Sequence, residues 1–161
     1  MSQMISIVGR SHSGTPTLIE KLIPARTRRG YRDGTIKHSH PKIDFDKTGK
    51  DSWRHQDAGA ETVIVASPGK IAMVKNDYRG SLDDLKKFFD DLDLVITEGY
   101  KKENKPTIEV VRSARHADAL LKADKYLVAV VSDVDLKLEV PIFGLEDIER
   151  LADFIEQKYL L

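Results

Sequence analysis

The chain has 161 residues, and 26 lysines and arginines balance 26 aspartates and glutamates, so its formal net charge is zero. This balance gives no electrostatic reason for a nucleic-acid or membrane partner, and we expect neither. The absence of cysteine excludes disulfides, thiol catalysis and cysteine metal sites. The first residues lack the apolar run of a signal peptide, and no stretch approaches about 18 uninterrupted apolar residues. We therefore expect a cytoplasmic protein with a single domain over residues 1–161.

The first predicted element is an apolar strand over residues 4–8, which runs directly into Gly9. Gly14 follows, and then an amphipathic helix over residues 17–29. This order of strand, glycine-bounded loop and helix is the order of a P-loop, whose pattern is GxxxxGK[ST]. The glycines free the backbone from steric limits on φ, so that N–H groups point at phosphate oxygens from a helix N-terminus. The sequence therefore predicts a phosphate-binding loop.

The loop lacks both side chains that the P-loop pattern uses. Thr15 stands where the pattern has lysine, and Pro16 stands where it has the magnesium-binding serine or threonine. A charge-assisted hydrogen bond to phosphate is worth roughly 1.5–3 kcal/mol, which is about tenfold to over a hundredfold in affinity. Because Pro16 has no N–H and disfavours a helical Thr15, we expect a distorted loop. The alternative is an ordinary helix start with Thr15 as N-cap and Pro16 as the first helical residue, which needs no ligand.

The segments after this helix alternate between strand-like and helix-like patterns, which favours an α/β fold. A short strand is expected over residues 31–37, and runs over 61–66 and 71–75 predict a β-hairpin. A helix capped by serine is expected over residues 81–89. The remaining expected elements are four strands and a closing helix, at residues 92–97, 107–111, 126–131, 140–142 and 145–159. Together these elements predict a P-loop NTPase-like three-layer fold with a mixed, mostly parallel sheet and an added hairpin.

An acidic residue, Glu98, follows the nearly all-apolar strand over residues 92–97. P-loop proteins hold magnesium, directly or through water, with an acidic residue at the carboxyl end of the buried strand beside the loop strand. Glu98 is therefore a candidate metal ligand, and Thr17 is a candidate for the missing hydroxyl although it stands one position late. The alternative for Glu98 is an exposed carboxylate before a turn at Gly99.

Polar residues follow the second expected strand, over a stretch from 39 to 52 that we expect to be a long loop. Lys37 and Arg54 are candidates for the positive charge that Thr15 does not supply, because strand ends in doubly wound sheets face the ligand crevice. Histidines and aspartates here indicate a possible metal site, with Asp51 as a candidate ligand: His38, His40, His55, Asp44, Asp46 and Asp51. Their spacing matches no strong ligand pattern, so a solvated polar loop is the alternative.

A basic run near the end of the first helix comprises Arg26, Arg28, Arg29 and Arg32. A nucleic-acid patch is one interpretation, but the run lacks interleaved aromatic residues beyond Tyr31. We interpret it instead as the favourable cationic end of the helix.

The motifs in their joint order resemble the molybdopterin-guanine dinucleotide biosynthesis protein B family. The resemblance spans nearly the whole chain and rests on the loop together with residues 18–24, 34–38, 49–54, 58–60 and 94–99. Members of that family are described as P-loop GTP-binding proteins related to nickel-enzyme maturation GTPases. They are typically dimeric and assist the enzyme that attaches GMP to molybdopterin. The resemblance implies GTP, with Mg²⁺ as a candidate, the molybdenum cofactor guanylyltransferase as partner, and a homodimer.

Carried over residue by residue, the resemblance implies these phosphate-binding residues: Gly9, Arg10, Ser11, His12, Ser13, Gly14, Thr15, Pro16, Thr17 and Lys37. The family's usual Gly-Lys-Thr-Thr is replaced from Gly14 to Thr17, which predicts weak or absent hydrolysis. The guanine motif Asn-Lys-x-Asp is missing, and Asp133, just after a strand, is the candidate for base recognition, with an ordinary turn aspartate as the alternative. The hairpin over residues 61–75 is a candidate dimer element, because exposed strand edges tend to be paired.

Three functional hypotheses follow. The favoured one is an accessory protein of molybdenum cofactor maturation that binds GTP or the pterin cofactor, with little or no hydrolysis. The second is an active GTPase in which Lys37 or a partner's residue replaces the missing lysine. The third is an interaction scaffold that has lost nucleotide binding and keeps only its contact with the guanylyltransferase.

Overall fold

A computed structural model describes residues 2–39, 42–76, 78–113 and 124–161. The chain forms two compact units, one made of residues 1–38 together with 89–161 and the other of residues 39–88. A single cooperatively folded domain over residues 1–161 stays a prediction.

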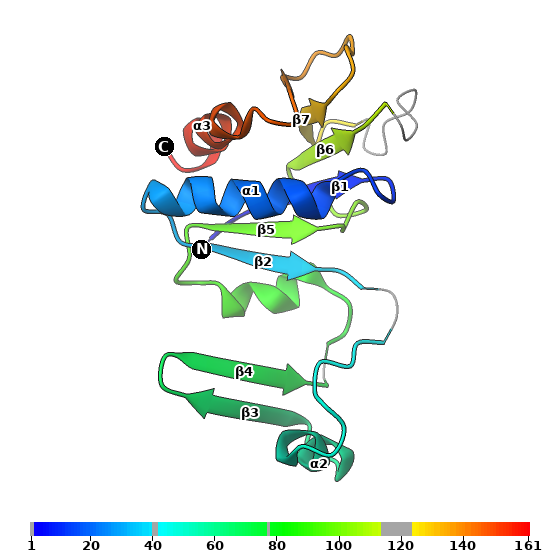
Figure 1. The fold of residues 1–161 in the computed structure, drawn as a ribbon, viewed down its shortest axis with the longest axis vertical. Helices are drawn as coiled ribbons and strands as arrows, with labels where there is room; N and C mark the ends of the chain where they lie inside the picture. Colours follow the sequence, from blue (N-terminus) through cyan, green and yellow to red (C-terminus); the bar gives the residue numbers. More distant parts are fainter. Residues whose placement is uncertain (1, 40–41, 77, 114–123) are drawn as a thin grey trace. The chain divides into compact units, whose positions relative to one another are not determined.

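Within the described part of the first unit, parallel strands form a six-stranded sheet in the order β2-β5-β1-β6-β7-β8 (Figure 1). The strands are β1 (Gln3–Gly9), β2 (Asp33–Lys37), β5 (Leu94–Glu98), β6 (Thr107–Val111), β7 (Leu127–Ser132) and β8 (Ile142–Phe143). Because the strands are parallel, their carboxyl ends lie at one edge of the sheet. The predicted phosphate-binding loop leaves β1 at this edge, and Glu98 ends the neighbouring strand β5 there.

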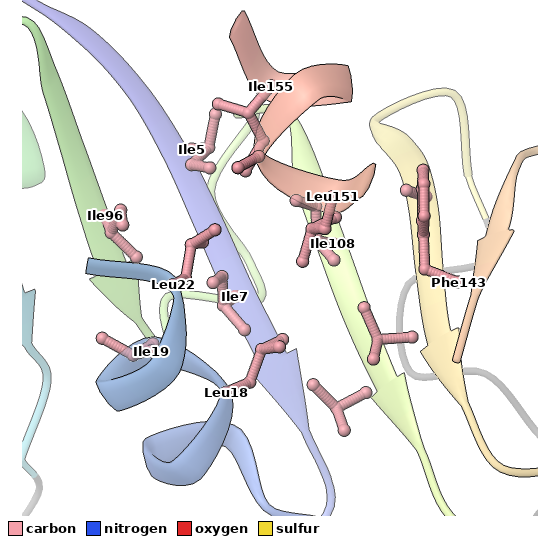
Figure 2. Close-up of a cluster of buried hydrophobic side chains, with 14 of the residues drawn as sticks. Ile5, Ile7, Leu18, Ile19, Leu22, Ile96, Ile108, Phe143, Leu151 and Ile155 are labelled. Carbon is pink, nitrogen blue, oxygen red and sulfur yellow. The ribbon is translucent and has the colours of Figure 1, made fainter. Parts of the chain in front are cut away.

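Helices α1 (Thr15–Arg28) and α3 (Ile148–Tyr159) pack on the core that the sheet buries on one face. Leu18 and Leu22 lie one turn apart on α1, as do Leu151 and Ile155 on α3, so each helix presents an apolar stripe. Figure 2 shows these side chains meeting alternate residues of the strands, such as Ile5 and Ile7 of β1. This packing fixes the start of α1 against the end of β1 and thereby positions the loop between them.

The second unit contains the predicted hairpin, formed by β3 (Thr62–Ser67) and β4 (Lys70–Lys75). The fold class predicted from the sequence is confirmed, and the antiparallel pairing lies in this separate two-stranded sheet. The segment predicted as an α-helix over residues 81–89 is a 3₁₀-helix, η1 (Leu82–Phe88). The Asp84 amide donates to the carbonyl oxygen of Ser81 at 3.3 Å, the i to i+3 spacing of a 3₁₀ turn.

The prediction of a loop over residues 39–52 is wrong for its last two residues, because a short helix, α2 (Asp51–Asp57), begins there. None of the residues of α2 is buried, so the segment carries no apolar periodicity that would predict a helix. Its charges suit the helix dipole, with Asp51 in the first turn and Arg54 in the last.

Two boundaries near the carboxyl end also differ from the prediction. The strand expected over 140–142 is β8 at Ile142–Phe143, and the closing helix begins at Ile148 rather than at residue 145. Gly144 explains the later start, since its amide donates to the Asp147 carboxylate at 2.8 Å and the Asp147 amide donates back to the Gly144 carbonyl at 3.1 Å. This turn occupies the residues that would have formed the first helical turn.

The basic run of α1 binds α3 electrostatically. Arg29 donates to the carboxylates of Glu149, Asp153 and Glu156 at 2.7–3.2 Å. Arg28 donates to Glu149 at 2.9 Å. These pairs support the interpretation of the run as a structural feature of the helix end.

Arg29→Met is expected to lower the melting temperature at about pH 7, and the difference from wild type should shrink in acid. The hydrogen bonds from Arg29, and then Arg28, hold the pKa of Glu149 below its ordinary value of 4.5. A carboxyl whose pKa is lower in the folded state stabilises the fold above the unfolded value, and this stability is lost as the pH falls through the folded pKa. Thermal melts of both proteins between about pH 7 and pH 3 test this; a difference of constant size would contradict it.

Candidate phosphate-binding site

The loop after β1 turns back sharply into α1. The Ser13 amide donates to the Arg10 carbonyl at 2.9 Å, and the Leu18 amide donates to Gly14 at 3.0 Å to begin the helix. His12 and Gly14 adopt left-handed conformations, with φ of 62° and 94°. A left-handed φ is uncommon for a residue with a side chain, and such conformations cluster at ligand-binding sites.

Gly9 lies under this loop, where an added Cβ would clash with side chains of the loop. A Cβ at position 9 would lie 2.1 Å from Ser13 Oγ and 2.8 Å from Thr15 Oγ1. The two hydroxyl oxygens lie 3.3 Å from each other, and both side chains are buried. The side chain of Thr15 is therefore packed beneath the loop.

The expectation for Thr15 and Pro16 is wrong in its geometry. Gly14 occupies the N-cap position, Thr15 is the first residue of α1 and Pro16 the second. Proline is tolerated in the first turn because the amide that it lacks would have no partner within the helix. The preference of a residue before proline for an extended conformation is overridden here, and the strand, loop and helix order predicted from the glycines is retained.

Lys37 and Glu98, two of the predicted site residues, lie together on the β5 side of the loop. Lys37 is paired with Glu98 in the register of β2 and β5, and Lys37 Nζ lies 3.9 Å from Glu98 Oε1. The Glu98 side chain is 25% exposed and that of Lys37 is 70% exposed, so a ligand can reach both. The candidate cation and the candidate metal carboxylate thus form an ion pair at the carboxyl edge of the sheet.

The other flank carries a cation that the sequence reasoning missed. Arg112 directly follows β6, and its Nη1 lies 3.6 Å from the position that a Cβ on Gly14 would take. Its Nε lies 4.0 Å from Asp133 Oδ2. No motif marks Arg112. The signal that would have found it is its position just after a strand beside the loop strand.

Asp133 follows β7 and is held by its neighbour. The Ser113 amide donates to Asp133 Oδ1 at 2.7 Å, and the Ser113 hydroxyl donates to Oδ2 at 3.1 Å. The hydrogen bond from the Ser113 amide is the main cause that lowers the pKa of Asp133, which keeps the carboxylate ionised. Its predicted role in reading guanine stays a prediction.

The remaining predicted site residues, Asp51, Arg54 and Thr17, are exposed. Asp51 and Arg54 lie in the second unit, where Arg54 Nη1 is 3.8 Å from Asp51 Oδ1, and Thr17 is exposed in the first turn of α1. Among residues 2–39, 42–76, 78–113 and 124–161, the structure contains no group of three or more histidines and carboxylates that could hold a metal ion. His40 lies outside these residues. In the same residues, no helix is long and apolar enough to cross a membrane.

The parallel sheet with a glycine-bounded loop between β1 and α1 defines a P-loop NTPase-like protein. The family of molybdopterin guanine dinucleotide synthesis protein B, MobB, matches residues 4–133. The chain therefore belongs to the MobB family and acts in molybdopterin-guanine dinucleotide biosynthesis.

Relatives and solved structures agree with this assignment. The chain is 39% identical to the molybdopterin-guanine dinucleotide biosynthesis adapter protein of Escherichia coli K12, over 96% of this chain and 92% of that protein. It is 40% identical to the adapter protein of Haemophilus influenzae, over 95% and 87% of the two chains. A crystal structure of molybdopterin-guanine biosynthesis protein B superposes with a TM-score of 0.78 at 32% identity, over 96% of this chain and 98% of that one. A MobB homologue from Bacillus stearothermophilus gives 0.72 at 28% identity, with 97% of each chain covered.

Proposed function

We propose that this MobB protein is an accessory nucleotide-binding protein whose loop from Gly9 to Thr17 takes the phosphates of GTP. It assists the molybdenum cofactor guanylyltransferase and hydrolyses GTP weakly or not at all. The observation that carries the proposal is the cradle at Gly9, where even one added carbon would meet the hydroxyl groups of Ser13 and Thr15. A backbone turned this tightly at the start of a helix is the arrangement that presents amide groups to phosphate oxygens.

We infer that Glu98 and Thr17 would supply the protein ligands of a Mg²⁺ bound with the nucleotide. Glu98 offers a partly exposed carboxylate, and Thr17 offers an exposed hydroxyl in the first turn of α1. Carboxylate and hydroxyl oxygens are ligands that this ion accepts. When bound, Mg²⁺ neutralises negative charge on the phosphate oxygens. Lys37 releases Glu98 for this purpose at little expense, because an ion pair between such exposed groups contributes at most about 1 kcal/mol.

Weak hydrolysis follows from the side chain at position 15. P-loop NTPases use a lysine there to stabilise the charge that develops on the transferred phosphoryl group. Thr15 carries no charge and is packed beneath the loop. Binding is therefore retained through the backbone, while the group that stabilises the transition state is missing.

The protein is also proposed to form a homodimer and to act in the cytoplasm. The hairpin of the second unit exposes the apolar side chains of Ile64, Val65, Ile71 and Met73. By the register of the strands, Ile64, Ile71 and Met73 share one face of the hairpin and Val65 lies on the other. Exposed apolar surface of this kind marks an interaction site, and we place the contact of a homodimer on the face of Ile64, Ile71 and Met73. We also propose a cytoplasmic location, with the guanylyltransferase and GTP or the molybdopterin cofactor as partners.

A calorimetric titration of GTP with Mg²⁺ into the wild-type protein tests the proposal, together with a phosphate-release assay. We expect saturable binding, and phosphate release close to that of a protein-free blank with and without the guanylyltransferase. The absence of heat at about 1 mM GTP, a concentration that detects even weak binding, would overturn nucleotide binding. Sustained phosphate release in the presence of the guanylyltransferase would instead identify an active GTPase.

A further inference from the structure

The fold holds Arg112 beside the phosphate loop although it is far away in the sequence. Strand β6 pairs with β1 so that Val110 is opposite Gly9, and Arg112 follows two residues later. Its guanidinium reaches the start of α1, with Nη1 at 3.6 Å and Cδ at 3.9 Å from the position of a Cβ on Gly14. The side chain is 43% exposed, so a ligand entering the loop can touch it.

Neighbouring residues anchor Arg112 in this position. Ser113 is bound to Asp133 through both its amide and its hydroxyl, which ties the chain after β6 to the chain after β7. The carboxylate that accepts these bonds also lies 4.0 Å from Arg112 Nε. The contact directs the Nε edge of the guanidinium toward Asp133 and leaves Nη1 on the side of Gly14.

Thr15, at the usual lysine position of the motif, and Lys37, the other candidate cation, are less suited than Arg112 to contact phosphate at the loop. Thr15 has no charge and lies beneath the loop. Lys37 lies on the other side of β1 from Arg112, at the end of β2 and beyond β5. A guanidinium is planar, always charged and able to donate two parallel hydrogen bonds to phosphate oxygens.

We propose that Arg112 supplies to the phosphates of the bound nucleotide the positive charge that Thr15 does not. The proposal rests on the proposed function, since it names the cation of the same nucleotide site. It assigns to Ser113 and Asp133 the role of positioning residues that keep Arg112 over the loop.

The test is a double-mutant cycle on GTP affinity, measured by calorimetry in the presence of Mg²⁺. Arg112→Met is made in the wild type and in the variant Thr15→Lys/Pro16→Thr, which restores the usual motif. In the wild type we expect the affinity to fall at least about tenfold, as for loss of a charge-assisted hydrogen bond. In the restored variant the new lysine supplies the charge, so the same substitution should reduce affinity by less than about threefold, and the two effects should not add.

Arg32→Met is the matched control. It removes the same charge from the amino-terminal edge of the sheet, where Arg32 pairs with Asp91 at 2.8 Å, and it should leave the affinity unchanged. Thermal melts establish that each variant is folded, and Arg112→Gln replaces Arg112→Met if the latter does not fold. A structural defect caused by Arg112→Met would lower the affinity in both backgrounds. It would therefore not explain a loss that Thr15→Lys/Pro16→Thr suppresses.

The outcomes separate the two proposals. If wild-type protein binds GTP and Arg112→Met binds it equally well, the role of Arg112 is overturned while the proposed function stands. An equal loss in both backgrounds also overturns it, because the arginine then acts independently of the missing lysine. If the wild type does not bind GTP at all, the proposed function fails, and this inference fails with it.

Discussion

Arg26→Met is expected to destabilise the protein by about 3–5 kcal/mol, because it leaves a buried carboxylate without its partner. The Arg26 side chain is completely buried, and that of Asp33 is 2% exposed. Arg26 Nε and Nη2 both donate to the Asp33 carboxylate, the latter at 2.8 Å, and the guanidinium lies 4.6 Å from the centre of the Tyr31 ring. This pair joins the end of α1 to the start of β2.

Urea denaturation measures the effect on the free energy of unfolding. Arg28→Met is the matched control, because Arg28 lies two residues away with an exposed side chain and should contribute at most about 1 kcal/mol. The double variant Arg26→Met/Asp33→Asn removes both charges and should recover much of the loss, since no charge is then left buried. A single variant within about 1 kcal/mol of the wild type would show that the pair is not needed.

Gly9→Val is expected to abolish nucleotide binding while the protein remains folded. The new side chain clashes with Ser13 and Thr15 and should displace the loop around them. Several amide–phosphate hydrogen bonds are then lost, each worth roughly 1.5–3 kcal/mol, so we expect affinity for GTP to fall by at least about a hundredfold. Overpacking should reduce the free energy of unfolding by only about 1–3 kcal/mol.

Calorimetry with GTP and Mg²⁺ checks this expectation, and thermal melting shows whether the variant is folded. Thr35→Val, on an exposed position of β2, introduces the same side chain away from the loop and should bind like the wild type. If folded Gly9→Val binds GTP as tightly as the control, the cradle at Gly9 is not the nucleotide site.

The features that the sequence predicted are those with strong local signals. The strand before Gly9, the loop and α1 follow from glycine spacing and apolar periodicity, and the apolar run of β5 indicates its central place in the sheet. The sequence predicts that Lys37 and Glu98 each lie at a strand end, and the parallel register brings them together. The end of a strand can be predicted from its local apolar pattern. The alternation of strands and helices along the sequence then indicates that these ends lie at the same side of a parallel sheet.

The missed features depend on contacts that no local pattern records. Helix α2 has no buried face, so nothing in its sequence marks it. The partner of Arg26 is Asp33, beyond the end of the helix, and the basic run alone gives no sign that one of its members is buried. Arg112 reaches Gly14 only because β6 pairs with β1. The residue type of Thr15 favours the N-cap position, whereas Gly14 takes that position in a left-handed conformation that favours glycine.

Nucleotide binding at the loop is tested most directly by following the backbone amides of the wild-type protein by NMR while GTP with Mg²⁺ is added. The account predicts that the largest shift changes fall on the amides of the loop between Gly9 and Thr17, with further changes at Arg112 and Ser113. Saturable shift changes confined to other parts of the chain, or no changes at about 1 mM GTP, would contradict it.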